Sequence, residues 1–159
     1  SGGHELRDNG TFKGTIAPKD ITPIFTDKII NQIQPTCVFE GFMDFLSFLS
    51  MKEEVTSACL VLNSVSNTAK AIRYMNAQGI SSIRTFLDND DAGRRAVQDF
   101  IKAGFHVEDM NIHYKDFKDL NEYHVSCVRE QQKRKAQEQT HISITGQNKK
   151  SKQVKLKMK

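Results

Sequence analysis

Short runs of apolar residues alternate with segments of helical periodicity along most of this 159-residue chain. Each apolar run is flanked by polar residues or glycine, as short buried strands are. In the segments between the runs, apolar residues recur every three or four positions. The pattern predicts strands at residues 36–39, 58–62, 83–87 and 111–114, and helices at residues 42–52, 67–78, 91–103 and 120–137. Alternating strands and helices are typical of an α/β fold with a parallel sheet covered on both faces.

The first residues follow a different pattern. His4–Arg7 and Thr11–Ile16 flank an Asp-Asn-Gly turn signal and predict a β-hairpin. Pro18 and Pro23 mark a connector, and the isoleucine spacing that follows predicts a helix over residues 24–34. We therefore expect a hairpin and connector at residues 1–23, an α/β domain at residues 24–128, and a helical extension with a tail at residues 129–159.

Charge is distributed unevenly between these parts. The chain has 23 Lys+Arg and 19 Asp+Glu, yet residues 129–159 carry a net charge of +8 and residues 1–128 a net charge of −4. The tail is polar and lacks aromatic residues, so we expect disorder beyond about residue 140. Such a tail suits salt-sensitive contacts with nucleic-acid phosphates, or serves only as a solubilising linker. Metal-binding carboxylates would explain an acidic body on a nucleic-acid-binding chain.

Several classes of protein are excluded by what the sequence lacks. No run of 18 apolar residues and no charged-then-apolar leader occurs, so we expect neither a membrane span nor a signal peptide. Cys37, Cys59 and Cys127 are too few and too scattered for a disulfide framework or a cysteine zinc site, so we expect three buried thiols in a cytoplasmic protein. Neither a dinucleotide fingerprint nor a P-loop is present. The chain starts with Ser-Gly-Gly, so we expect a fragment with a tag remnant.

Polar residues stand where each predicted strand gives way to a helix. Glu40 follows the first strand of the alternating region, Asn63 the second and Asp88 the third. In open α/β sheets this carboxyl edge is where ligands bind. Asp44 lies four positions after Glu40, on the same side of the predicted helix start. An acidic pocket of this kind either holds divalent ions or has raised pKa values.

The run Asp88-Asn89-Asp90-Asp91 has two interpretations. Asp90 could cap the following helix and Asp91 could favour its first turn, which leaves Asp88 unexplained. Alternatively, a strand-to-helix turn brings Asp88 and Asp90 onto one ion, and hard carboxylate oxygens suit Mg²⁺. Spacing alone does not decide between a cap and a metal site.

Three segments resemble the Toprim domain of bacterial replicative DNA primases, of the kind carried by phages and mobile elements. Residues 38–44 (VFEGFMD) are similar to the first Toprim motif, and residues 87–96 (LDNDDAGRRA) are similar to the second. Residues 118–123 (KDLNEY) are similar to a Lys-Asp segment of those primases. The hairpin and residues 19–22 resemble segments that precede Toprim, so that the resemblance covers about residues 5–125.

The resemblance implies a Toprim fold with a four-stranded parallel sheet and Mg²⁺ or Mn²⁺ at its acidic edge. It implies these roles: Glu40 as general acid/base or metal-positioning carboxylate, Asp88 and Asp90 as catalytic metal ligands, Asp44 and Asp119 as secondary metal-site acids, and Arg94, Arg95 and Lys118 as contacts to nucleotide or nucleic-acid phosphates. A solvated helix face is the simpler explanation of the two arginines.

Two positions depart from the family pattern. Asn121 stands where these primases often have a second Asp, which we expect to weaken one metal position. The loop at residues 63–67 lacks a glycine that Toprim chains often carry, although Asn67 can cap the next helix.

The function that the resemblance implies is that of a DNA primase catalytic core: metal-dependent nucleotidyl transfer that makes RNA primers. Its partners would be single-stranded DNA, ribonucleotides and a replicative helicase. The zinc-binding domain common in such primases is not among these residues, so we expect poor priming by the chain alone. Two alternatives stay open: a Toprim-type metal-dependent nuclease or strand-breaking enzyme, for which only Tyr74, Tyr114 and Tyr123 could be nucleophiles, and a non-catalytic DNA-binding Toprim module.

Overall fold

The computed structural model describes residues 4–7, 13–16, 20–24 and 34–156, with side chains described for residues 20–24 and 34–139. Its strands are β1 (His4–Arg7), β2 (Lys13–Ile16), β3 (Thr22–Ile24), β4 (Thr36–Phe39), β5 (Cys59–Val61), β6 (Ser82–Phe86) and β7 (His106–Asp109). Its helices are α1 (Phe42–Met51), α2 (Thr68–Ala77), α3 (Asp91–Lys102) and α4 (Leu120–Leu156), with short 3₁₀ turns η2 (Val65–Asn67) and η3 (Met110–Tyr114).

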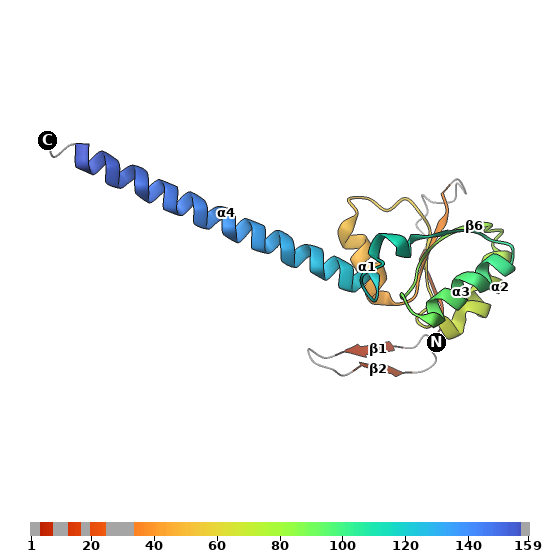
Figure 1. The fold of residues 1–159 in the computed structure, drawn as a ribbon. Coiled ribbons are helices and arrows are strands. Elements are labelled where there is room, and N and C mark those ends of the chain that lie inside the picture. The colour runs from red at the N-terminus through yellow and green to blue at the C-terminus, as the bar shows by residue number, and fades with distance from the viewer. Residues whose placement is uncertain (1–3, 8–12, 17–19, 25–33, 157–159) are drawn as a thin grey trace. The chain divides into compact units, whose positions relative to one another are not determined.

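Five of the described strands form one sheet in the order β3-β5-β4-β6-β7 (Figure 1). The pairs β4–β5, β4–β6 and β6–β7 are parallel, and β3 pairs with β5 antiparallel. The predicted α/β class with a mainly parallel sheet is thus confirmed. The sheet has one strand more than the four expected, because the edge strand β3 is short and contains Pro23, which the sequence pattern assigned to a connector.

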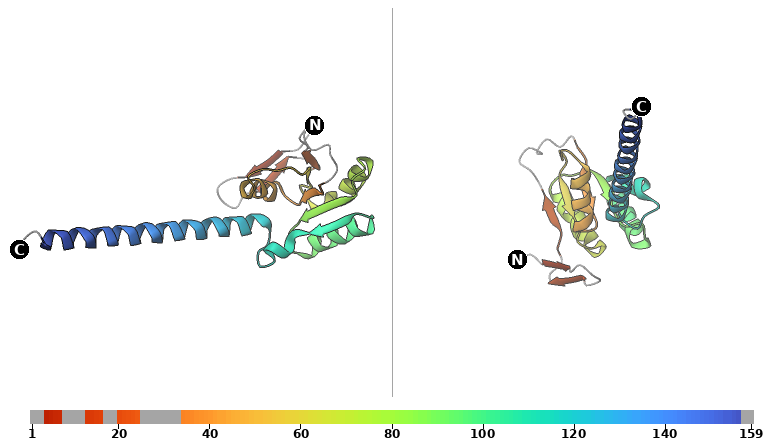
Figure 2. Two further views of the ribbon diagram at one scale, coloured as in Figure 1. Left: turned by 90° about the horizontal axis from the view of Figure 1, so that it is seen from above. Right: turned by 90° about the vertical axis from the view of Figure 1, so that its left-hand side faces the viewer.

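Helices cover both faces of this sheet, as Figures 1 and 2 show. On one face, α2 and α3 lie side by side over Val38 and Leu60. On the other face, α1 and η3 pack over Phe39 and Val61. Burial on both faces explains why the strands of the sequence are continuous apolar runs rather than alternating ones.

An aromatic cluster lies directly beneath the end of β4. Phe39 stacks on Phe86 of the neighbouring strand, with ring centroids 4.9 Å apart, and also meets Phe45 and Phe48 of α1. Stacked and edge-on aromatic pairs add to the free energy gained by burial. The cluster holds the strand ends and the start of α1 in one place, immediately before Glu40.

Two element predictions are wrong. The predicted strand at residues 111–114 is the turn η3, and the last strand of the sheet is β7, paired in parallel with β6. Asp109 explains the change, because its side chain accepts a hydrogen bond from the Asn111 N–H and so favours a turn. Ile24 belongs to β3 rather than to a helix, and the rest of the helix predicted over residues 24–34 lies mostly outside the described residues.

The hairpin prediction is confirmed where it can be seen. Strand β1 pairs with β2 antiparallel, with His4 opposite Ile16, while the predicted Asp-Asn-Gly turn lies outside the described residues. Gly79 and Gly104, which follow the ends of α2 and α3, have φ angles of +69° and +91°, a left-handed conformation that glycine adopts easily.

The C-terminal part differs from expectation in length. Helix α4 continues to Leu156, well past the predicted end at residue 137 and into the segment expected to be disordered. Residues 124–156 contain no proline and many residues with good helix propensity, which permits one long helix. The chain divides into two compact units, Ser1–Tyr123 and His124–Lys159. No helix among the described residues combines the length and apolarity that a membrane crossing needs.

The cysteine expectation holds for two of three residues. Cys37 and Cys59 are free and buried on adjacent strands, whereas Cys127 is free and only half-buried, because it lies on the exposed helix α4 rather than in the sheet.

Candidate active site

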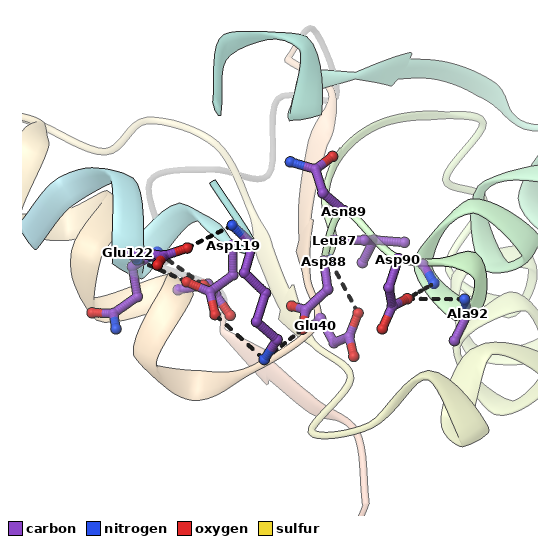
Figure 3. Close-up of polar contacts among 12 residues, drawn as sticks. Glu40, Leu87, Asp88, Asn89, Asp90, Ala92, Asp119 and Glu122 are labelled. Atoms are coloured by element: carbon purple, nitrogen blue, oxygen red, sulfur yellow. Dashed lines mark hydrogen bonds and ion pairs between the residues drawn. The ribbon is translucent and has the colours of Figure 1, made fainter. Parts of the chain in front are cut away.

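The carboxyl ends of β4 and β6 lie side by side and place Glu40 next to Asp88. Phe39 is the register partner of Phe86, and the Glu40 N–H donates a hydrogen bond to the Phe86 carbonyl at 3.2 Å. Parallel pairing therefore brings together two carboxylates that are 48 positions apart in sequence. Figure 3 shows Glu40, Asp88 and Asp90 at this edge, as the strand pattern predicts.

Glu40 is the carboxylate held most directly against the second motif. Its Oε2 accepts a hydrogen bond from the Asp88 backbone N–H at 3.1 Å. Burial raises the pKa of Glu40 to about 7, and the negative charges of Asp88, Asp90 and Asp44 act in the same direction, against the hydrogen bond. A carboxyl group with this pKa exists in both protonation states near neutral pH.

Asp90 does form the helix cap that its position suggested. Its Oδ1 accepts hydrogen bonds from the N–H groups of Ala92, at 2.9 Å, and Gly93, at 2.8 Å. A Cβ atom on Gly93 would overlap the Asp88 carbonyl oxygen, so the loop closes tightly onto the first turn of α3. One oxygen of Asp90 thus fixes the loop. The cap uses only Oδ1, so the other carboxylate oxygen of Asp90 takes no part in it.

Asn89 ties this loop to the segment that leads into the Lys-Asp segment, residues 118–123. Its side-chain Nδ2 donates to the carbonyl groups of Tyr114, at 3.0 Å, and Phe117, at 2.8 Å. Its backbone N–H donates to the Lys118 carbonyl at 2.7 Å, and the Tyr114 hydroxyl donates to the Leu87 carbonyl at 2.9 Å. Sequence reasoning missed Asn89 and Tyr114, because partners 25 or more positions away leave no local pattern.

Lys118 faces the acidic edge from this segment. Its Nζ lies 3.3 Å from Asp88 Oδ2 and 3.8 Å from Asp119 Oδ2. Burial raises the pKa of Asp88, and the Lys118 charge opposes that shift. The same contact with Asp88 raises the pKa of Lys118.

The remaining two predicted acids are fixed by the start of α4. Asp119 Oδ1 accepts from the Glu122 N–H at 2.7 Å, and Glu122 Oε2 accepts from the Lys118 N–H at 2.7 Å, a reciprocal cap. Asp44, on α1, accepts from the Asn121 N–H at 3.1 Å. Burial, followed by the charge of Asp119, raises the pKa of Asp44 to about 6.

Asn121 has a structural role that its departure from the family pattern did not suggest. Its Oδ1 accepts a hydrogen bond from the buried Ser47 hydroxyl at 3.0 Å, which links α1 to the start of α4. Its effect on a metal position stays a prediction.

Asn67 does not cap α2 with its side chain, contrary to expectation. Its Nδ2 instead donates to the Leu62 carbonyl at 2.8 Å and ties the loop to the end of β5.

The contacts of the two arginines agree with the simpler explanation, a solvated helix face. Arg94 forms an exposed ion pair with Asp91 at 2.6 Å and a second contact with the Asn89 carbonyl at 3.3 Å. Arg95 is exposed on the same helix turn. Both arginines follow the acidic edge closely in sequence, and the two contacts of Arg94 are with residues no more than five positions away.

The donor atoms at this edge fit a hard divalent cation. Glu40, Asp88 and Asp90 offer carboxylate oxygens, and the raised pKa values of Glu40 and Asp88 reflect the cost of gathering and burying like charges. Within the described residues, no three carboxylate, histidine or cysteine side chains already converge as a metal cage. The edge therefore offers suitable ligand atoms, but fewer than three of the described side chains lie close enough together to hold one ion.

Taken together, the parallel sheet and its acidic carboxyl edge define an α/β protein with a candidate site at the strand ends. The family model described as Toprim-like matches residues 37–124, more than half of the chain, so the chain belongs to the Toprim-like family. The matched range contains all the motif residues described above.

One solved structure shows the same fold at low sequence identity. It is the crystal structure of the primase fragment of the bacteriophage T7 primase-helicase protein, with a TM-score of 0.54 and 20% identity. The match covers 78% of this chain and 52% of that one, so this chain spans about half of the fragment. No curated protein matches the chain.

Proposed function

We propose that this chain is the Toprim part of a DNA primase, which uses Mg²⁺ or Mn²⁺ for nucleotidyl transfer during RNA primer synthesis on single-stranded DNA. The observation that carries the proposal is the meeting of Glu40 and Asp88 at adjacent parallel strand ends, joined by the 3.1 Å hydrogen bond. Membership of the Toprim-like family and the fold shared with a phage primase fragment support it.

The residues at the edge suit this chemistry. Nucleotidyl transfer depends mainly on positioning and on charge stabilisation at the phosphoryl group. A divalent ion supplies that charge stabilisation, and Asp88 and Asp90 would hold it, flanked by Asp44 and Asp119. Glu40 is suited to hold or release a proton, because its pKa of about 7 keeps both forms populated near neutral pH.

Cationic side chains would contact the nucleotide and the template. Lys118 is the best placed of the three candidates, since its ammonium group already lies at the acidic edge. Arg94 and Arg95 are exposed on the first turns of α3, beside the second motif. Ribonucleotides, single-stranded DNA and a replicative helicase are the partners that the proposal includes.

Metal binding is the first test. Calorimetric titration of the chain with Mn²⁺ should show binding that disappears in the Asp88→Asn/Asp90→Asn double variant. Asn is as good a helix N-cap as Asp, so the substitution removes charge while it preserves the cap of α3. Asn76→Ala, an exposed change on α2, is the control that should bind like the wild type.

Template-directed ribonucleotide incorporation is the second test, made on the protein in its natural length. Asp88→Asn should abolish incorporation, and unchanged incorporation would sink the proposal. Nicking of plasmid DNA that requires metal and no nucleotides would point to a nuclease instead. DNA binding that survives both EDTA and Glu40→Gln, with no incorporation, would point to a non-catalytic binding module.

A further inference from the structure

Lys118 places a positive charge between two acids of the edge that come from different segments. Asp88 ends the β6 strand region and Asp119 begins α4, and the Lys118 Nζ lies 3.3 Å and 3.8 Å from their Oδ2 atoms. Among the described residues, no other lysine or arginine pairs with Asp88. Within the part of the chain that the structure describes, the Asp88 carboxylate therefore has one partner cation.

The backbone of Lys118 is fixed by hydrogen bonds, whereas its side chain can move away from Asp88. The Lys118 carbonyl accepts from the Asn89 N–H at 2.7 Å and its N–H donates to Glu122 at 2.7 Å. The side chain is nevertheless 69% exposed, so its tip is not held by packing. A lysine of this kind is a tethered cation, able to move away from Asp88 without disturbing the loop.

We propose that Lys118 is a built-in counter-cation of the acidic edge, which a divalent ion must displace from Asp88. This inference rests on the proposed metal-dependent function. An ammonium group and a metal ion compete for the same carboxylate oxygens, and two cations about 4 Å apart repel each other even in water. Once displaced, the Lys118 ammonium is available to a phosphate group, which it cannot contact while it holds Asp88.

A merely structural ion pair predicts a different result. Exposed lysine–carboxylate pairs contribute little to the free energy of unfolding. Lys118→Met keeps the length and the backbone contacts of the residue, so either model expects only a small change in thermal stability. The two explanations differ in metal affinity. A purely structural ion pair predicts that Lys118→Met leaves the Mn²⁺ affinity unchanged.

The test is calorimetric titration with Mn²⁺ at fixed ionic strength. Lys118→Met should bind Mn²⁺ about fivefold more tightly than the wild type, because the metal no longer has to break an ion pair of two unit charges, which is worth about 1 kcal/mol at about 4 Å in a water-like dielectric. Lys115→Met is the matched control: it makes the same change of net charge in the same segment, and no described residue forms an ion pair with Lys115. Lys118→Arg retains the charge and should not tighten binding.

Each other outcome overturns the inference. Equal affinities of the wild type and Lys118→Met, or equal tightening by Lys115→Met, would mean that Lys118 does not compete with the metal. Weaker binding by Lys118→Met would mean that Lys118 supports the site rather than blocks it. Absence of Mn²⁺ binding from the wild type and all variants would remove the metal-dependent proposal as well, and that result differs from a failure of the inference alone.

Discussion

Glu40 is a carboxyl group whose protonated form is favoured by both burial and the charges around it. It lies half-buried at the end of β4, with Asp88, Asp90 and Asp44 close enough to raise its pKa. Its one described hydrogen bond comes from the Asp88 N–H and favours the carboxylate, and this effect is the smaller one. With pKa values of about 7 for Glu40 and about 6 for Asp44, both carboxyl groups of the edge titrate near neutral pH in the absence of metal, and Glu40 titrates at the higher pH.

The pH dependence of stability should reveal this group. The folded-state pKa of Glu40, about 7, lies above its ordinary value of 4.5, so its contribution to stability is complete below about pH 4.5 and is lost as the pH rises through 7. In metal-free buffer we expect the melting temperature of the wild type to fall between pH 5 and 8. Glu40→Gln keeps an acceptor for the Asp88 N–H and should show a shallower fall, measured by differential scanning calorimetry.

The control for this experiment is Glu53→Gln, which replaces an exposed glutamate after α1. Its melting temperatures should follow the wild-type slope. Parallel slopes for Glu40→Gln and the wild type would mean that Glu40 does not titrate in this range.

At the scale of elements, the site depends on how tightly the β6–α3 loop closes. Asp90 binds two N–H groups of the first turn of α3, and Gly93 allows that turn to lie against the Asp88 carbonyl. Asn89 then joins the loop to the segment before α4. Two consecutive polar residues, Asn89 and Asp90, thus fix backbone positions, and the Asp88 carboxylate is oriented as a result.

Gly93→Ala should disrupt this closure. The new methyl group would overlap backbone atoms of Asp88, which cannot rotate away as a side chain can. We expect a loss of about 1–3 kcal/mol in the free energy of unfolding from overpacking, partly offset by about 1 kcal/mol of improved helix propensity. Urea denaturation measures the change. Mn²⁺ affinity should fall with it, because Asp88 is displaced.

Gln98→Ala provides the comparison on the same helix, at an exposed position where a methyl group meets no backbone. It should leave both quantities close to wild type. A stable Gly93→Ala protein with unchanged Mn²⁺ affinity would show that the loop is not tightly closed against α3.

The sequence predicts the central elements well because their signals are local. The apolar runs of β4, β5 and β6 and the polar residues after them follow from burial on both faces of a parallel sheet. The proximity of Glu40 and Asp88 could be predicted from the sequence, because the carboxyl ends of parallel strands meet at one edge of the sheet. The contacts of Lys118 with Asp88 and of Asn121 with Ser47 could not, because they depend on where the Lys-Asp segment, residues 118–123, lies against the second motif and α1. Edge strand β3 was missed because tertiary pairing, not its composition, makes it a strand.

At the scale of the whole molecule, two units have opposite charge. The Toprim-like unit carries the acidic edge, and the C-terminal residues 129–159 carry a net charge of +8. Six of the lysines in that segment, and no acid, follow residue 138. For the proposed primase function, a site that joins nucleotides and a segment that retains the template are separate requirements, and the charge distribution is compatible with both.

Removal of the terminal charge should therefore weaken DNA binding without affecting the metal site. We expect replacement of the six terminal lysines by glutamine, at residues 149, 150, 152, 155, 157 and 159, to lower affinity for a single-stranded oligonucleotide and to flatten its salt dependence. Each phosphate contact on a single strand contributes about 0.7 to the slope of log affinity against log salt, so the slope should decrease by up to about 4. Fluorescence anisotropy over a salt series measures it, and Mn²⁺ binding by the same variant is the control, expected to match the wild type. A variant that keeps both the affinity and the slope would identify the tail as a linker, because a segment that binds phosphates cannot lose its charge and retain its salt dependence.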